Sequence, residues 1–144
     1  MVDKITFGVI FKLFILFLIG GTAYFCIEVL WRGNSHISML IVGGICFILI
    51  GAVNNHFPWS LGLVQQTLIS ALVITVVEFI SGMLINIGID LNVWDYSTLP
   101  FNLFGQICLL YSVLWIPLSV IGIFLDDWLR CKLFKEEKPH YTII

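Results

Sequence analysis

The chain has 144 residues and a formal net charge of -2; 60% of its residues are hydrophobic and 11% are charged. A soluble domain normally carries about 25% charged residues, so this composition excludes an ordinary soluble domain. The near-neutral charge gives no support to nucleic-acid binding or to a basic peripheral membrane protein. No Asp, Glu, Lys or Arg occurs between residues 33 and 77 or between residues 96 and 125. Each run exceeds the roughly 20 apolar residues that cross a bilayer, so we predict an integral membrane protein.

The apolar segments predict four transmembrane helices, at residues 7–31, 37–53, 61–87 and 101–128. A turn around Pro58 separates the second span from the third, because proline disfavours helix at the preceding residue. Pro117 lies inside the fourth span, where it should kink the helix. We therefore predict an all-α four-helix bundle that forms a single transmembrane domain, residues 1–144.

The distribution of basic residues predicts the orientation of the bundle. Four basic residues fall in the tail, residues 129–144, which the positive-inside rule places in the cytoplasm. An even number of spans returns the N-terminus to the same side, in agreement with Lys4 and Lys12. The prediction is therefore N-in/C-in, although Arg32 then lies on the external side, against the rule. A cleaved signal peptide is an alternative for the N-terminus, because basic residues precede the apolar run at residues 13–19.

The histidines and cysteines of the chain predict neither a metal centre nor a cofactor. The three histidines fall in opposite turns and in the tail, and the four cysteines form no CxxC motif. The phosphate-loop, zinc-protease and serine-hydrolase signatures are also absent from the sequence. We therefore expect no enzyme, with a lipid-modifying activity as the remaining alternative.

Ionisable residues inside the spans are the first candidates for function, because they are costly in a bilayer. Glu28 and Arg32 are four residues apart on the first helix, a spacing that predicts an ion pair. Glu78 lies in a stripe of small and polar residues on the third helix, where its carboxylate must be paired, hydrated or protonated. Both groups have a structural interpretation, in which they only lock helices together.

Further polar residues are expected at the same depth. Asn102 and Gln106 are four apart on the predicted fourth helix, so they should share a face and bond to neighbouring helices. In the predicted topology a set of polar and aromatic residues lies in or near the outer half of the bilayer: Glu28, Arg32, Glu78, Trp94, Asp95, Asn102 and Gln106. This cluster predicts a cavity that opens to the outside.

One stretch of the chain has a family resemblance. It comprises Trp94-Asp95-Tyr96-Ser97, then Pro100-Phe101-Asn102-Leu103-Phe104-Gly105-Gln106-Ile107-Cys108-Leu109, and Trp115. This stretch resembles the ABC-transporter type IV (CmpB-like) family of small bacterial membrane proteins, and the match continues upstream through residues 78–82. The resemblance implies a multi-pass permease that needs a separate ATPase. Carried over residue by residue, it points to Glu78, Trp94, Asp95, Tyr96, Ser97, Asn102, Gly105 and Gln106.

The leading hypothesis is a small transporter- or channel-like protein of the plasma membrane, acting as a homo-oligomer because four short helices enclose little volume. Glu78 and the Glu28–Arg32 pair would line a polar site, with Asp95 and Gln106 at its outer mouth. The alternatives are a structural or interaction subunit and a holin-like protein that perturbs the bilayer. The expected partners are membrane lipids and a separate protein, and no nucleic acid. The sequence leaves the solute open.

Overall fold

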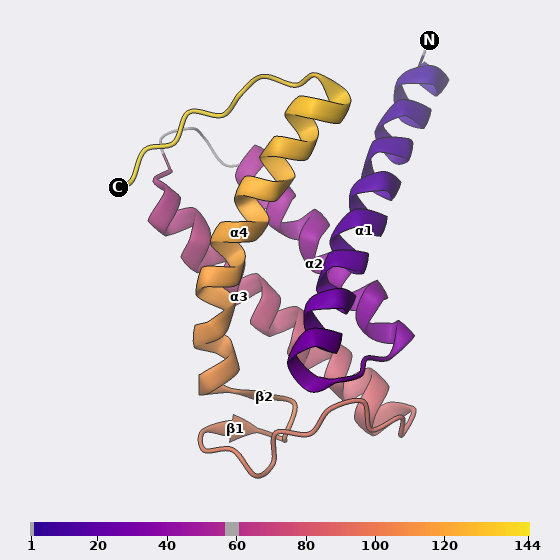
Figure 1. Ribbon diagram of the computed structural model, residues 1–144, viewed down its shortest axis with the longest axis vertical. Coiled ribbons are helices and arrows are strands. Elements are labelled where there is room, and N and C mark those ends of the chain that lie inside the picture. Colours follow the sequence, from indigo (N-terminus) through magenta and orange to yellow (C-terminus); the bar gives the residue numbers. More distant parts are fainter. Residues whose placement is uncertain (1, 57–60) are drawn as a thin grey trace.

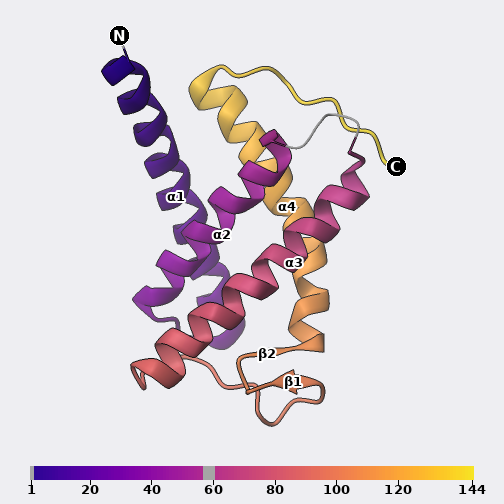
Figure 2. The same ribbon diagram turned by 180° about the vertical axis from the view of Figure 1, so that it is seen from behind.

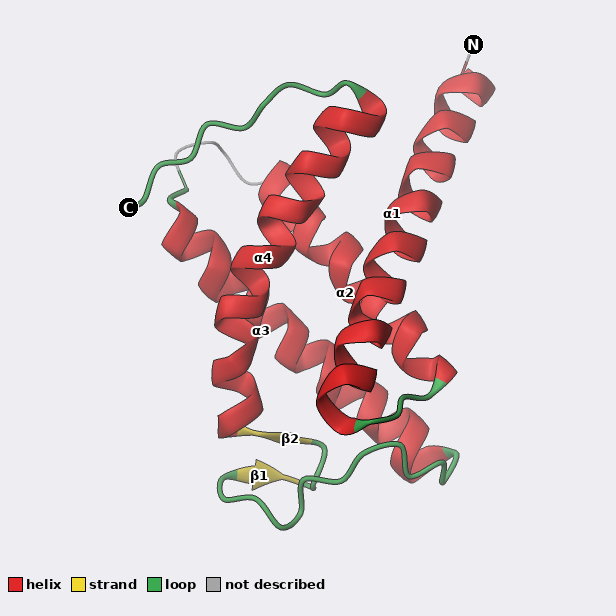
Figure 3. Cartoon of the chain, in the orientation of Figure 1, coloured by secondary structure: helices red, strands yellow, loops and turns green. Residues whose placement is uncertain are grey.

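The computed structural model describes residues 2–56 and 61–144, and its elements are shown in Figures 1 and 3. In chain order they are α1 (Val2–Arg32), α2 (Ile37–His56), α3 (Leu63–Gly82), the π-helix η1 (Met83–Gly88), β1 (Asn102–Leu103), β2 (Ile107–Cys108) and α4 (Leu109–Phe134). Within the described residues, four helical segments are long and apolar enough to cross a membrane, with η1 continuing α3. The predicted all-α membrane bundle is therefore confirmed.

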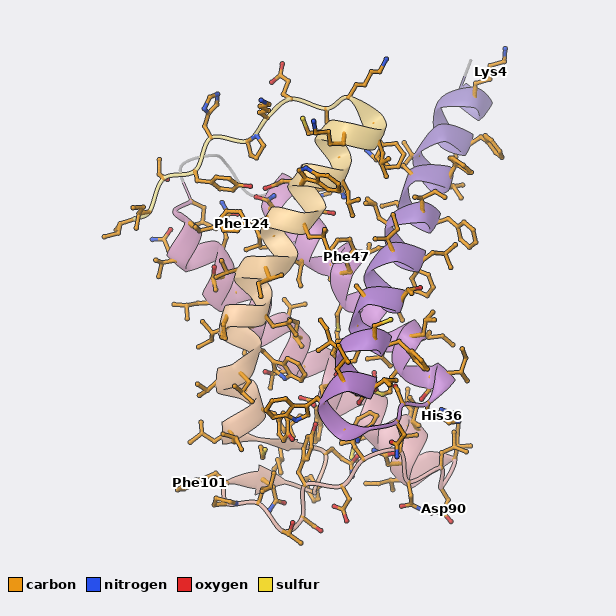
Figure 4. The ribbon with its side chains drawn as sticks, viewed as in Figure 1. Lys4, His36, Phe47, Asp90, Phe101 and Phe124 are labelled. Carbon is orange, nitrogen blue, oxygen red and sulfur yellow. The ribbon has the colours of Figure 1, made fainter. Side chains whose placement is uncertain are left out.

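The two termini lie at the same end of the bundle, and the β1–β2 hairpin lies at the opposite end (Figure 1). We refer to these as the terminal end and the hairpin end. Figure 4 places Lys4 at the terminal end and His36, Asp90 and Phe101 at the hairpin end. This arrangement agrees with an even number of spans, and the cytoplasmic location of the terminal end stays a prediction from the charge pattern. The turn predicted around Pro58 falls in residues 57–60, outside the described residues.

Glycines allow α1 and α2 to approach closely. A Cβ atom on Gly20 would lie 2.3 Å from the Phe47 side chain, and one on Gly21 would lie 2.3 Å from the Leu40 carbonyl oxygen. Membrane helices use small residues in this way because lipid provides little hydrophobic force to join them. Figure 2 shows α2 and α3 running beside each other on the opposite face of the bundle, where α3 passes in front of α4. The core between α2, α3 and α4 contains Val42, Cys46, Ile50, Ala71, Ile74, Trp115 and Ile123.

The predicted start of the fourth span was wrong. Residues 101–108 form an antiparallel hairpin, in which Asn102 pairs with Cys108, and α4 begins only at Leu109. Phe101 and Phe104 have φ angles of 54° and 51°, which a right-handed helix cannot contain. The segment carries no charge, so its apolar composition resembled the start of a span. Asn102 and Gln106 therefore do not share a helical face.

The predicted end of the fourth span also differed. The helix continues to Phe134, six residues beyond the expected boundary, and Pro117 lies in its interior. It ends where Lys135 adopts a left-handed conformation with φ 55° and donates its backbone N–H to the Arg130 carbonyl. The rest of the predicted tail folds back onto α3, where the backbone N–H of Leu63 donates to the Thr142 oxygen at 2.6 Å.

Candidate functional site

Glu78 is the centre of the candidate site. Its side chain is 6% exposed on α3, within the membrane-spanning part of the chain. The Tyr96 hydroxyl donates to one carboxylate oxygen at 2.9 Å, and the Trp115 indole N–H donates to the other at 2.9 Å. The loop that carries Asp95 thus supplies a partner, whereas Arg32 bonds to Glu28 and Val93. Each oxygen of this buried carboxylate has one strong donor from outside α3.

An aromatic cluster positions those two donors. Tyr96 stacks on Tyr111 with ring centroids 4.6 Å apart, and Tyr111 and Tyr24 each lie within 6.4 Å of Trp115. Burial, followed by the negative charge of Glu78, raises the pKa of Tyr96 above its ordinary value. The phenol therefore keeps its proton at physiological pH and can donate it in a hydrogen bond to the carboxylate.

A cavity of about 90 Å³ adjoins Glu78 and its donor Trp115. All four long helices contribute to its lining, and among the described residues Glu78 is the one charged group in it. The walls are apolar and include four aromatic side chains, Tyr24, Phe47, Trp94 and Trp115. Phe47 lies between α1 and α4 in Figure 4. Two lining residues, Ile27 and Ile121, are 43% and 60% exposed, so the cavity reaches the surface between α1 and α4 that faces lipid.

The predicted ion pair between Glu28 and Arg32 is confirmed, with an N–O distance of 2.9 Å. Ser35 also donates to Glu28, and Arg32 donates to the Val93 carbonyl at 3.3 Å. The bond to Val93 ties the end of α1 to the loop that follows η1, and the bond from Ser35 ties it to the turn before α2. Neither Glu28 nor Arg32 lines the Glu78 cavity. The pair therefore closes the hairpin end of the bundle, beside the cavity.

Gln106 joins the hairpin to α3 and η1 although it does not lie on a helix. Its side-chain oxygen accepts from Asn86 at 2.8 Å, and its carbonyl accepts from the Trp94 indole at 3.0 Å. The Asn86 oxygen in turn accepts from the Val93 backbone N–H at 2.8 Å. A Cβ atom on Gly82 would lie 2.5 Å from the Gln106 oxygen, so only glycine leaves room for this bond.

The other residues of the family motif shape the loop itself. Asp95 accepts from the Ser97 backbone N–H at 2.8 Å and from its hydroxyl at 3.0 Å. These two bonds lower the pKa of Asp95, which is fully exposed. Asn102 donates to the Leu99 carbonyl at 2.8 Å and accepts from Gly105 N–H at 3.1 Å. Asp95 and Asn102 therefore stabilise turns, which local Asn and Asp bonds do in general.

Sequence reasoning missed a second polar cluster, at the terminal end. Asp126 is fully buried and forms an ion pair with Arg130 at 2.7 Å. Its neighbour Asp127 accepts from Asn54 and from Tyr141. The i, i+4 spacing of Asp126 and Arg130 was the available signal, the same one that identified Glu28 and Arg32. It was overlooked because the predicted span ended at residue 128, between the two partners.

No metal site accompanies either polar cluster within the described residues, where no group of three or more His, Cys, Asp or Glu could hold an ion. Cys46 and Cys108 are buried free thiols that pack in the bundle.

The model of the family described as "Putative ABC-transporter type IV" matches residues 10–141. That match covers the four helices and the hairpin, so the chain belongs to this family, and the resemblance seen in its sequence is confirmed. No curated protein and no solved structure matches the chain.

Proposed function

We propose that this member of the ABC-transporter type IV family is the membrane-spanning part of a transporter. Its solute site would be the cavity at Glu78. The solute class that fits best is a small organic cation with apolar substituents. The observation that carries the proposal is one buried carboxylate at the wall of an otherwise apolar, aromatic cavity. The multi-pass bundle would act in the plasma membrane.

The chemistry of the lining favours a cation over other solutes. An ionised carboxylate in an apolar site requires a positive partner, which a solute cation supplies. Indole and phenol faces attract quaternary ammonium groups, and Tyr24, Trp94 and Trp115 stand in the cavity wall. A sugar or an inorganic anion would lose its hydration and find few donors there.

The remaining predicted site residues have supporting roles in this proposal. Glu28, Arg32, Asp95, Asn102 and Gln106 bond to the loop and hairpin and keep the end of the cavity closed. The chain would act as a carrier and not as an enzyme. Since its sequence contains no phosphate loop, a separate ATPase would supply the energy, and a second copy of the chain would complete the pathway.

Binding of benzyltrimethylammonium to the purified protein tests the proposal by titration calorimetry. Glu78→Gln should weaken binding at least tenfold, which is about 1.4 kcal/mol. Asp127→Asn is the matched control, because it removes a buried carboxylate that lies at the terminal end and does not line the cavity, and its affinity should stay within twofold. Neopentylbenzene, the neutral isostere, should bind both forms equally. Equal binding of the cation to wild type and Glu78→Gln would refute the solute class.

A structural or interaction subunit is the second candidate. It is favoured by the hairpin end, where Glu28, Asn86 and Gln106 all find partners inside the chain. Proteoliposomes separate the two functions, because a carrier accelerates the uptake of a labelled cation and a structural subunit does not. General leakage of a neutral dye would instead support a protein that perturbs the bilayer.

A further inference from the structure

Several buried polar atoms between α2, α3 and α4 lack a hydrogen-bond partner in the described part of the chain. They are the Gln66 Oε1, Thr67 Oγ1 and Ser70 Oγ atoms on α3, and the Ser119 Oγ and Asp126 Oδ1 atoms on α4. Ser70, Ser119 and Asp126 are fully buried, and Gln66 and Thr67 are at most 8% exposed. The Thr75 hydroxyl differs, because it donates to the Ala71 carbonyl at 2.9 Å.

These atoms are spaced along the bundle from Glu78 toward the terminal end. The helices α3 and α4 run in opposite directions, and Trp115 on α4 meets Glu78 on α3 (Figures 1 and 2). With a rise of about 1.5 Å per residue, Ser119 lies about 6 Å beyond this meeting point along α4. On α3, Ser70 lies about 12 Å beyond it. Each helix thus carries unpartnered polar atoms on the terminal side of the contact between Glu78 and Trp115.

Each helix carries a further unpartnered atom about 16 Å from the same meeting point. Thr67 lies at that distance along α3, and Asp126 lies at that distance along α4. Asp126 faces α2, because a Cβ atom on Gly51 would lie 2.7 Å from its unpartnered Oδ1 atom. Along each helix the unpartnered atoms recur within about two turns of one another, so water molecules between the helices would reach polar groups from both.

Each end of the series meets a cavity. At the terminal end a polar pocket of about 170 Å³ is lined by Gln66, Asn54, Asp127, Arg130 and the tail residue Tyr141. Gln66 belongs both to this pocket and to the set of unpartnered atoms. At the other end lie Glu78 and the apolar cavity. The unpartnered atoms of α3 and α4 thus lie between a polar pocket at the terminal end and Glu78, the one charged group among the described residues that line the candidate solute cavity.

We propose that these side chains line a file of water molecules that gives Glu78 proton access from the terminal end. Buried water typically satisfies hydroxyl and carboxylate groups that the protein leaves without partners, and such a file moves protons along its hydrogen bonds. Protonated Glu78 would release its proton to the first water when an organic cation binds, giving a carboxylate–cation pair and a hydronium ion. This last step rests on the proposed function, whereas the hydration of the file does not.

Other ionisable groups face the two ends of the file. Tyr24 on α1, Cys46 on α2 and Tyr96 of the loop interact with Glu78, and Glu28 acts on it from the end of α1. Asp126 interacts with Arg130 and Asp127 on α4 and with Glu136 of the tail. Among the described residues, the unpartnered side-chain atoms on the way from Glu78 to Asp126 are the hydroxyls of Ser119, Ser70 and Thr67, so the proposed file needs no further charged side chain.

Water-edited solid-state NMR of the protein in lipid bilayers tests the file without any solute. Magnetisation should pass from water to Ser70 and Ser119 as fast as to Gln66, and at least threefold faster than to Leu16, which is fully buried between apolar neighbours. Transfer to both serines as slow as transfer to Leu16 would mean a dry interface and would overturn the proposal.

Stopped-flow detection of proton release on benzyltrimethylammonium binding tests the function of the file. The double variant Ser70→Ala and Ser119→Ala should slow release at least tenfold and leave the dissociation constant within twofold of wild type. Thr75→Val is the matched control, since its hydroxyl already has a partner, and it should change neither quantity. An unchanged release rate together with higher thermal stability would identify dry, unpaired hydroxyls and refute the file. Absence of cation binding alone would refute the proposed function, while the NMR result would still decide the hydration.

Discussion

The two ends of the bundle carry the same ion-pair motif in different surroundings. At the hairpin end, Glu28 and Arg32 are 2.9 Å apart and the Arg32 side chain is 27% exposed. At the terminal end, Asp126 and Arg130 are 2.7 Å apart and their side chains are 0% and 9% exposed. Ser35 gives Glu28 an additional donor, whereas one Asp126 oxygen has no partner among the described residues. Equal spacing in sequence therefore predicts the ion pair but not its burial. The burial decides how much stability is lost when the pair is broken.

Arg130→Met should have the largest effect on stability. Removing the cation leaves the fully buried Asp126 carboxylate without its partner, which costs about 3–5 kcal/mol. Reversible unfolding in mixed micelles, followed by tryptophan fluorescence, measures the change. If Arg130→Met lowers the free energy of unfolding less than Arg32→Met at the hairpin end, the proposed difference between the two ends is wrong.

Gly51→Ala should destabilise the terminal end by about 1–3 kcal/mol, because the new methyl group would lie 2.7 Å from an Asp126 oxygen. Gly8→Ala is the control in the same assay, since a Cβ atom there meets nothing within 4 Å. Equal stability of the two variants would show that Asp126 moves freely and is not held against α2.

Arg32→Met should cost about 1 kcal/mol, since the pair at the hairpin end is partly exposed and Glu28 retains the Ser35 donor. The same unfolding assay gives the value. The loop should loosen as well, because the bond from Arg32 to the Val93 carbonyl is lost, and faster amide exchange between residues 90 and 97 would report this. A cost equal to that of Arg130→Met would remove the distinction between the two ends.

The smallest effect concerns Asp95 in the exposed loop. The two Ser97 donors lower its pKa, so its contribution is fully present above the ordinary aspartate pKa and is lost as pH falls through the lowered value. The Ser97 amide proton should follow this titration by NMR. Asp95→Asn should abolish the pH step and keep the turn, because the amide oxygen still accepts. A step at the ordinary aspartate pKa would contradict the assigned hydrogen bonds.

The sequence was sufficient for the membrane fold because hydropathy depends on composition alone. The four apolar segments became four helices. The hairpin could not be predicted in this way, because residues 101–108 carry no charge and lead directly into an apolar helix, and the positive φ angles of Phe101 and Phe104 have no compositional signal. The end of α4 was misplaced because Asp126 marked the end of an uncharged run, and the partner that allows its burial lies one turn later.

The candidate site was partly predictable for a similar reason. Glu78 stood out as a carboxylate inside a span, and the motif residue Tyr96 proved to be its hydrogen-bond donor. Depth in the bilayer grouped Glu78 with Glu28 and Arg32, but depth does not reveal which side chains face a cavity. That distinction depends on helix rotation and on the path of the loop, which a single sequence does not specify.

The central claim is that Glu78 and its aromatic neighbours bind an organic cation, and the Trp115 indole reports on it directly because it donates to Glu78. We would titrate the protein in nanodiscs with benzyltrimethylammonium and record the indole N–H signals by NMR. The account predicts a saturable shift of the Trp115 signal in wild type that disappears in Glu78→Gln, with no shift at the exposed Trp128. A Trp115 signal that does not respond, or one that responds equally in Glu78→Gln, would contradict it.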